Sequence, residues 1–399
     1  MNDLGPKVTG TQANEVLAVK YLMNRIKTIQ SKANVNQTLT LDHQVASGSY
    51  FLGFKPYGMV TTYRKVQNIV VRLEGDTTNA LMINCHFDSV PGSPGASDDG
   101  ANCVIMLELL SIFSSRETKS RHTIIFVFNG AEETGLRASH GFITQHKWVK
   151  DIKAFINLEA AGSGGKESLF QTGPGNTWLL RHYKAVQRPF AQAVGEEIFQ
   201  SGLIPSDTDF RIFRDYGNLS GLDFAHAHKG YRYHTKFDSI DYLTKNVLQR
   251  TGENMLNLVT SLSNSFELDD LSAFSKNSSA VYFDFLGFFF IYYPKEVGAV
   301  INFAVVIFSI IIPFLTLTKA TVNIHSKNIL SETLIGFVSI VFGSGFSGLV
   351  CYVIAYAIDK MDHAMSWYRN TWLAPGIYVT AAVIAHILVF DLVELTLAR

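Results

Sequence analysis

One histidine and three aspartates stand close together in the stretch NCHFDSVPGSPGASDDGA, residues 84–101. The apolar run before His86 predicts a strand that ends near His86 and Asp88. Asp98 and Asp99 then follow a loop rich in glycine, proline and serine, which can fold a carboxylate back towards the histidine. Because imidazole and carboxylate suit a divalent cation such as zinc, the stretch predicts the beginning of a metal site.

Further candidate ligands follow later predicted strands. Glu132 and Glu133 come directly after the apolar run 122–128, and Glu159 ends the next short strand. In parallel α/β sheets, ligands bind outside the carboxyl ends of the strands. We therefore expect these glutamates to lie near His86.

The full set of candidate ligands suits two zinc ions about 3.5 to 4 Å apart, provided that one carboxylate bridges them. Asp98 is the predicted bridge. His86 and Glu159 would complete the site of one ion, and Glu133 and His234 the site of the other. Each ion then receives one histidine and one terminal carboxylate.

Three acidic neighbours are predicted to support this site. Glu132 is the candidate general base, which takes a proton from water and returns it to a leaving amine. Asp88 is expected to accept the second imidazole N–H of His86 and so to fix its tautomer. Asp99 either acts in a similar way or caps the following helix.

The elements around these residues alternate between strand and helix, which predicts a mostly parallel α/β sheet covered by helices on both faces. The predicted strands are 38–45, 50–54, 68–73, 81–85, 122–128, 154–158 and 221–227. The predicted helices are 14–29, 104–113, 139–147, 178–193 and 242–266, with a loop at 201–213. This domain is expected to occupy residues 1–267, followed by a polar linker at 268–280.

The C-terminal part has a membrane-like composition. The chain of 399 residues is 47% hydrophobic and 17% charged, and the apolar excess follows residue 281. Within region 295–399, three apolar stretches are each long enough to cross about 30 Å of hydrocarbon: 297–317, 329–358 and 373–393. Segment 281–294 is too short to span and rich in Phe and Tyr, so it either lies flat at the interface or joins a fourth span.

Charge gives limited further information. The net charge is +0 and no block of Lys and Arg stands out, which excludes a nucleic-acid partner held through phosphates. Lys319, His325 and Lys327 between the first two spans predict a cytosolic loop, and hence a lumenal α/β domain. The polar N-terminus has no signal-peptide core, so we expect a truncated or alternative start.

The cysteines and glycosylation sequons bear on the compartment. Cys85, Cys103 and Cys351 are too few for a disulfide framework and are expected to pack as small hydrophobes, although a bridge between the first two stays open. The sequons begin at Asn36, Asn218 and Asn277. They would be usable in a secretory lumen, which favours a glycoprotein.

The motifs HFDS, PGASDDGA, NGAEETGLRASHGF, NLEAAG and YHTKFDSID resemble those of the di-zinc exopeptidases, the family of bacterial leucyl aminopeptidases, plasma glutamate carboxypeptidase and glutaminyl cyclase. The resemblance covers about residues 14–266. It implies the ligand and base roles given above, a cis peptide between Asp98 and Asp99, and a lumenal catalytic domain. It also implies an N-terminal anchor and more than three spans.

We expect a multi-pass membrane protein of the endoplasmic reticulum. Its zinc exopeptidase domain is expected to remove terminal residues from peptides. One alternative is a glutaminyl-cyclase-like aminoacyltransferase with a single zinc, which zinc stoichiometry would distinguish. Another is a catalytically silent scaffold with the peptidase fold. Loss of ligands would mark the scaffold, and all the predicted ligands are present in this sequence.

Two features bear on the substrate. Asp207, Asp209 and Arg211 lie in a loop that the resemblance places near the substrate, where an acid could meet a free amino terminus; a plain surface loop is the alternative. Tyr231 and Tyr233 either donate to a developing oxyanion or serve in packing.

Overall fold

The computed structural model describes residues 1–271, 278–321 and 326–397. The chain divides into two compact units, Met1–Gly298 and Ala299–Arg399. The first unit holds all of the candidate metal ligands, and the second holds most of the apolar C-terminal region.

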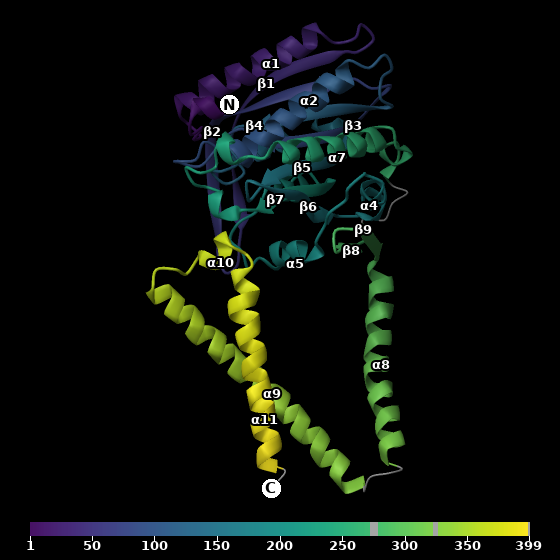
Figure 1. Cartoon of the computed structure of the whole chain (residues 1–399). Helices are drawn as coiled ribbons and strands as arrows, with labels where there is room; N and C mark the ends of the chain where they lie inside the picture. The colour runs from purple at the N-terminus through teal and green to yellow at the C-terminus, as the bar shows by residue number, and fades with distance from the viewer. Residues whose placement is uncertain (272–277, 322–325, 398–399) are drawn as a thin grey trace. The chain divides into compact units, whose positions relative to one another are not determined.

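A seven-stranded sheet forms the centre of the first unit. Its strands are β1 (Leu39–Gly53), β2 (Gly58–Leu73), β3 (Thr77–His86), β4 (His122–Asn129), β5 (Ile152–Ala160), β6 (Gly164–Gly173) and β7 (Ser220–His228). They are arranged in the order β1-β2-β4-β3-β5-β7-β6 (Figure 1). The central strands β4, β3, β5 and β7 run parallel, whereas β1, β2 and β6 pair antiparallel at the edges. The predicted mostly parallel sheet is confirmed.

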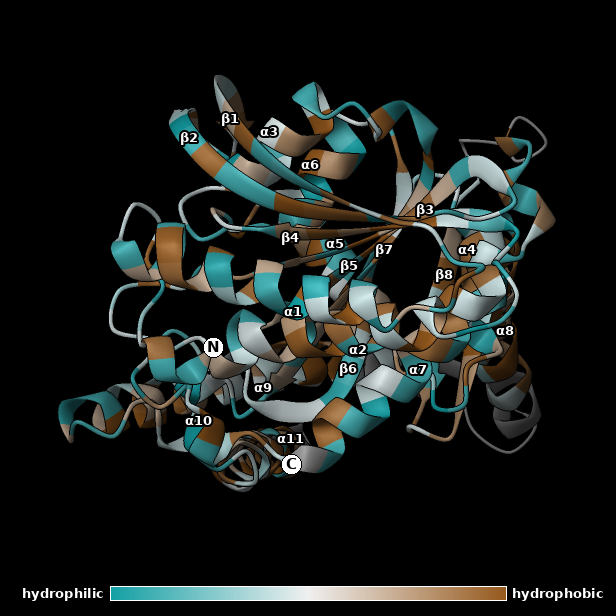
Figure 2. Ribbon diagram, turned by 90° about the horizontal axis from the view of Figure 1, so that it is seen from above, coloured by the Kyte–Doolittle hydropathy of each residue, from teal (hydrophilic) through white to brown (hydrophobic). Residues whose placement is uncertain are grey.

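Helices cover both faces of this sheet. They are α1 (Val19–Ser31), α2 (Asn102–Ser114), α3 (Arg137–Gln145), α4 (Thr177–Lys184), α5 (Ala193–Ser201), α6 (Asp209–Asp215) and α7 (Lys245–Ser263). Single turns are η1 (Asn2–Leu4), η2 (Ala13–Ala18), η3 (Ala96–Ala101), η4 (Val149–Asp151), η5 (Gly230–Arg232), η6 (Ile240–Tyr242) and η7 (Phe266–Leu268). Figure 2 shows α3 and α6 on one side of the sheet, and α1, α2 and α7 on the other.

The central strands are apolar because both of their faces are buried. Along β3, Leu81 and Ile83 join the core beneath α1, α2, α4 and α7. Ala80 and Met82 join the core beneath α3 and α6. Successive side chains of a strand point to opposite faces, so the continuous apolar runs supply two cores at once.

Several elements differ from the sequence prediction. The two predicted strands 38–45 and 50–54 form one long strand, β1, because the pairing continues across a bulge between Ala46 and Gly48. The predicted helix 178–193 is wrong in its second half: α4 ends at Lys184, Pro189 follows, and α5 starts at Ala193. Strand β6 and helix α6 were not predicted, and α6, with seven residues, is too short for a clear periodicity.

Residues 280–294 form a hairpin of β8 (Ala280–Phe285) and β9 (Phe289–Pro294). The alternative in which this segment joins a fourth transmembrane helix is therefore wrong. A lipid-interface location for it stays a prediction. Residues 272–277 of the predicted linker lie outside the described part of the chain.

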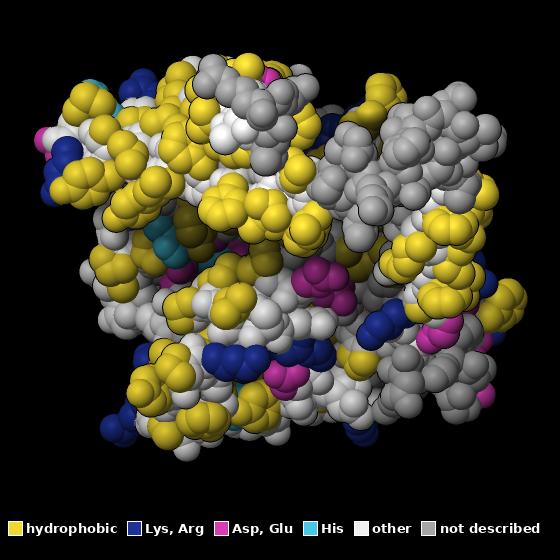
Figure 3. Space-filling view, turned by 90° about the horizontal axis from the view of Figure 1, so that it is seen from below, with side chains coloured by type: hydrophobic (Ala, Val, Ile, Leu, Met, Phe, Trp, Pro, Cys, Tyr) yellow, Lys and Arg dark blue, Asp and Glu magenta, His cyan; other side chains and the backbone are white. Residues whose placement is uncertain are grey.

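The second unit contains the predicted apolar helices. They are α8 (Lys295–Thr321), which starts in the first unit, α9 (Ser326–Lys360) and α11 (Thr380–Leu397), with the short α10 (Ser366–Arg369) and η9 (Pro375–Val379). Among the described residues, three helices are long and apolar enough to cross a membrane, with windows at Lys295–Thr316, Thr333–Lys360 and Pro375–Val393. Hydrophobic side chains gather over much of the face shown in Figure 3. His325 of the predicted cytosolic loop lies outside the described residues, so the orientation stays a prediction.

Replacing Phe126 with alanine should destabilise the first unit strongly. Its ring is fully buried in the core beneath α1 and α2, and its loss leaves a cavity that costs about 3–5 kcal/mol. Thermal unfolding of the full chain in detergent measures the effect. Val35→Ala is the matched control, because Val35 is 98% exposed and its truncation should leave the melting temperature nearly unchanged. Equal melting temperatures for the two variants would contradict the assignment of this core.

Candidate metal centre

The candidate ligands meet at the carboxyl ends of three parallel strands. His86 is the last residue of β3, and it pairs in register with Asn129 at the end of β4. Glu132 and Glu133 follow β4 after a short turn, and Glu159 is the second-last residue of β5. The predicted convergence at this edge of the sheet is therefore present in the structure.

Asp98 lies between the two histidines and presents one oxygen to each. Its Oδ1 is 3.2 Å from Nε2 of His86, and its Oδ2 is 3.2 Å from Nε2 of His234. The same His86 nitrogen is 3.4 Å from Glu159 Oε2, and the same His234 nitrogen is 3.1 Å from Glu133 Oε2. The side chains thus form two triplets that share Asp98.

The donor chemistry of these triplets fits divalent cations. In each triplet the potential ligand atoms lie within 4.8 Å of one another, and a further group of the same kind contains Glu132. Three carboxylates converge with only two imidazoles, an arrangement that is costly to bury unless positive charge balances it. Glu133 Oε1 is buried and has no hydrogen-bond partner among the described residues, as expected of an oxygen atom that coordinates a cation.

The metal-free electrostatics show how strongly these groups interact. Burial alone would raise the pKa of Asp98, but hydrogen bonds from His234 and His86 lower it to about 2. Burial and the charge of Asp98 raise the pKa of Glu133 to about 8. Burial opposes protonation of His234, yet its bonds to Asp98 and Glu133 raise its pKa to about 9. Without a cation, the cluster therefore holds protons where metal ligands would be deprotonated.

Asp88 positions the loop that carries the two glutamates. Its carboxylate accepts the main-chain N–H groups of Glu132 at 3.0 Å and Glu133 at 3.1 Å. The Nδ1 atom of His86 lies 3.1 Å from the main-chain oxygen of Asp88 and 3.5 Å from its Oδ1. Asp88 therefore holds both the histidine and the glutamate loop, but the hydrogen bond of the imidazole goes to its main-chain oxygen and not to the carboxylate, which is the predicted acceptor.

Asp99 is buried beneath the site. Its carboxylate accepts the main-chain N–H of His86 at 3.3 Å and a side-chain N–H of Asn102. These contacts favour the supporting role of Asp99 over the helix-cap alternative. The peptide bond between Asp98 and Asp99 is cis, as the resemblance implied.

Two supporting residues were missed by the sequence analysis. Asp238 accepts the main-chain N–H groups of Ser97 at 2.8 Å and Asp98 at 3.1 Å, and so holds the loop that carries the shared carboxylate. Asp238 lies four residues after His234, within the motif YHTKFDSID, which is the sequence signal for it. Lys7 is fully buried and donates to the main-chain oxygen of Pro94, and no local pattern indicated this.

The loop with the predicted substrate acid divides into two parts. Asp209 is fully buried and accepts side-chain N–H groups of Asn84, at 2.9 Å, and Asn129, so it belongs to the floor of the site. Asp207 instead lines a cavity next to the metal centre. Its carboxylate is 3.4 Å from Nη1 of Arg211. Of the two acids, only Asp207 is placed where a substrate could meet it.

That cavity has a volume of about 370 Å³ and two kinds of wall. The candidate metal ligands Asp98 and Glu159 and the candidate base Glu132 lie along one part, together with Tyr233. Another part is apolar and includes Phe199 of α5. The cavity can therefore hold an apolar group beside the metal centre.

The model of peptidase family M28 matches residues 68–259, which include all of the candidate ligands. The chain contains a peptidase family M28 domain. This chain is similar to endoplasmic reticulum metallopeptidase 1 of Mus musculus, at 43% identity over 98% of this chain and 43% of the relative. It is also similar to putative endoplasmic reticulum metallopeptidase 1-B of Caenorhabditis elegans, at 39% identity over 100% of this chain and 44% of that protein.

A shorter match is to the vacuolar membrane protease of Yarrowia lipolytica, at 35% identity over 69% of this chain and 27% of the relative. This chain thus spans less than half the length of these curated relatives. Among solved structures, a zinc aminopeptidase from Bacillus subtilis is similar, with a TM-score of 0.48, 15% identity, and coverage of 69% of this chain and 95% of that one. The glutaminyl cyclase of Porphyromonas gingivalis has the same TM-score and identity, over 65% of this chain and 93% of its own.

Zinc binding to the metal-free protein should release protons at pH 7. Glu133, with a pKa of about 8, and His234, with a pKa of about 9, are largely protonated there, and metal ligands must be deprotonated. The affinity should therefore fall as the pH is lowered from about 9 to 7. Calorimetric titrations in buffers of different ionisation enthalpy measure the released protons. His234→Gln should reduce the release, and identical heats in all buffers would contradict this prediction.

Proposed function

We propose that this protein is a membrane-anchored, zinc-dependent exopeptidase that hydrolyses terminal peptide bonds. The observation that carries the proposal is that two triplets share Asp98, which lies between the two histidines, and that Glu132 lines the cavity beside them. The M28 domain and the printed names of the relatives support it. We propose two zinc ions, because each triplet contains one histidine and two carboxylates.

The proposed holders are His86, Asp98 and Glu159 for one ion, and Asp98, Glu133 and His234 for the other. When bound, zinc lowers the pKa of a water and polarises the scissile carbonyl. Side chains of this protein would carry out the proton transfers and stabilise the oxyanion.

Glu132 is the proposed general base. It lines the cavity, and the bonds from Asp88 fix the backbone of its loop. Burial and the nearby charge of Glu159 raise the pKa of Glu132 well above its usual value. Bound cations would oppose this shift and keep Glu132 deprotonated, so that it can take the proton of the attacking water and return it to the leaving amine.

Tyr233 is the proposed donor to the developing oxyanion. It lines the cavity beside Asp98 and Glu132, and its ring stacks on His234 with centroids 3.6 Å apart. Burial and the charge of Asp98 raise its pKa, so the phenol keeps its proton and can donate it in a hydrogen bond.

We propose that the catalytic domain faces the lumen of the endoplasmic reticulum. Relatives of this chain carry that organelle in their names, and three helices suit a multi-pass anchor. The sequon residues Asn36 and Asn218 are exposed and thus available for glycosylation. The proposed arrangement is a catalytic domain at 1–267, connecting segments at 268–280 and 281–294, and a membrane region at 295–399.

Replacing Glu132 with alanine should lower the turnover of terminally unblocked peptides by about 10²- to 10⁴-fold, the usual contribution of a general base. The protein should still bind zinc, since Glu132 belongs to neither of the triplets that share Asp98. A panel of peptides blocked at the amino or the carboxyl end, assayed beside zinc analysis, measures both effects. Glu117→Ala, at an exposed glutamate, is the control.

Loss of activity towards peptides blocked at one end would establish which terminus is trimmed. One zinc per chain with cyclisation of amino-terminal glutamine would support the aminoacyltransferase alternative instead. Two zinc ions without turnover of any peptide would favour the scaffold. Full activity of Glu132→Ala would contradict the assigned base.

A further inference from the structure

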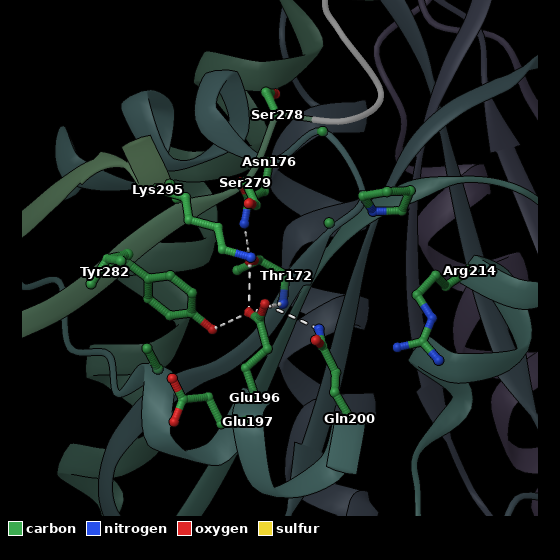
Figure 4. Close-up of a pocket in the computed structure, with 16 residues that line it drawn as sticks. Thr172, Asn176, Glu196, Glu197, Gln200, Arg214, Ser278, Ser279, Tyr282 and Lys295 are labelled. Carbon is green, nitrogen blue, oxygen red and sulfur yellow. Dashed lines mark hydrogen bonds between the residues drawn. The ribbon is translucent and has the colours of Figure 1, made fainter. Parts of the chain in front are cut away.

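The hairpin β8–β9 is firmly attached to the M28 domain. Tyr282 of β8 is fully buried, and its hydroxyl donates to Glu196 Oε2 of α5 at 2.7 Å (Figure 4). The main-chain N–H of Asp284 donates to the oxygen of Ala191 at 3.0 Å, just before α5. Phe290 of β9 lies in the core with the residues beneath α4 and α7. The hairpin is therefore an extension of the domain rather than a loose linker.

Further contacts join the hairpin to the sheet. Glu196 Oε2 also accepts the main-chain N–H of Thr172 at 3.1 Å and its hydroxyl at 2.9 Å, at the end of β6. An isolated antiparallel β-bridge pairs Gln192 with Phe283 of β8. The main-chain N–H of Gln192 also donates to the main-chain oxygen of Leu169 of β6, at 3.0 Å. The position of the hairpin is thus set by the edge of the sheet.

The turn of this hairpin exposes only large apolar side chains around a glycine. The exposed fractions are 48% for Phe285, 78% for Leu286, 83% for Phe288 and 53% for Phe289. The turn is well defined, because the N–H of Gly287 donates to Asp284 Oδ2 at 2.6 Å. Transfer of apolar surface out of water is favourable by about 25 cal/mol per Å², so this turn gains stability from an apolar surrounding.

The sequence that follows the hairpin indicates that a lipid bilayer is the apolar environment near this turn. Strand β9 runs directly into α8, whose window Lys295–Thr316 has a mean hydropathy of 2.5. From Phe289 to Lys295 the chain can extend only about 20 Å, at roughly 3.3 Å per residue. The turn is therefore tethered close to the point where the first predicted span begins. Lys166, whose Nζ lies next to Gly287, adds a cation that suits lipid phosphate groups.

We propose that the turn 285–289 inserts its phenylalanine and leucine side chains into the interface of the lipid bilayer and so fixes the M28 domain at the membrane surface. A bilayer accounts for the exposed apolar side chains and the adjoining span together. The hairpin that carries this turn is joined to α5 by the hydrogen bond between Tyr282 and Glu196. Phe199, on the other side of α5, forms part of the cavity wall. The inference rests on α8 being a membrane span, the anchor in the proposed function, and it is independent of peptidase activity.

The test uses nitroxide labels on the full chain, with one chain per phosphatidylcholine nanodisc. Labels are placed by Phe288→Cys in the turn, Val35→Cys as the water-exposed reference, and Phe308→Cys within the α8 window. The background carries Cys351→Ser, since Cys85 and Cys103 are fully buried. Collision rates with oxygen, which concentrates in lipid, and with a water-soluble nickel complex report the surroundings of each label.

We expect the label at 288 to collide several-fold less with the nickel complex, relative to oxygen, than the label at 35, with the label at 308 still more shielded. A label introduced by Leu286→Cys should give the same result as the one at 288, and guards against a local disturbance. If 308 is shielded and both turn labels are as accessible as 35, the inference is wrong and the span stands. If 308 is accessible to nickel, the span fails and the inference fails with it.

Discussion

The structure of the candidate centre depends on one carboxylate. Asp98 faces His86 with one oxygen and His234 with the other, so two triplets can exist only while this side chain holds its orientation. The surrounding contacts serve that purpose. Asp238 binds the N–H groups of Ser97 and Asp98, and Asp99 reaches the backbone of His86. A proposed bridging ligand needs such support, because small shifts would break the contacts to both sides.

The sheet provides the rigid base for this arrangement. Its central strands are buried on both faces, which leaves them little freedom to move, and their carboxyl ends stop level with one another. The charged groups of the candidate centre lie at this edge, where backbone N–H groups hold the carboxylates of Asp88 and Asp99. Asn84, Asn129 and Asp209 form the polar floor between the charges and the apolar interior. Burial of so many acidic groups is consistent with a site that receives cations.

Helix α5 has a distinct position in the molecule. One side contributes Phe199 to the cavity beside the metal centre, and Glu196 on another side binds the hairpin that leads to α8. Neither contact was visible in the sequence, where residues 178–193 were predicted to be one helix. Helix α4 ends at Lys184, Pro189 prevents a helix from continuing through residue 189, and the chain runs beside β6 at Ala191 before α5 begins.

The sequence by itself determined the central elements and the identity of the candidate ligands. Continuous apolar runs predicted the buried strands, and strand ends followed by His, Asp and Glu predicted where candidate ligands would gather, because both signals lie within a few neighbouring residues. Tertiary structure alone decided which oxygen of Asp98 faces which histidine, and that Lys7 and Asp238 support the same loop. It also turned residues 280–294 into a hairpin on the domain. Several of these outcomes depend on contacts between residues far apart in the sequence, such as Asp98 with His234 and with Asp238, and local periodicity carries no information about such contacts.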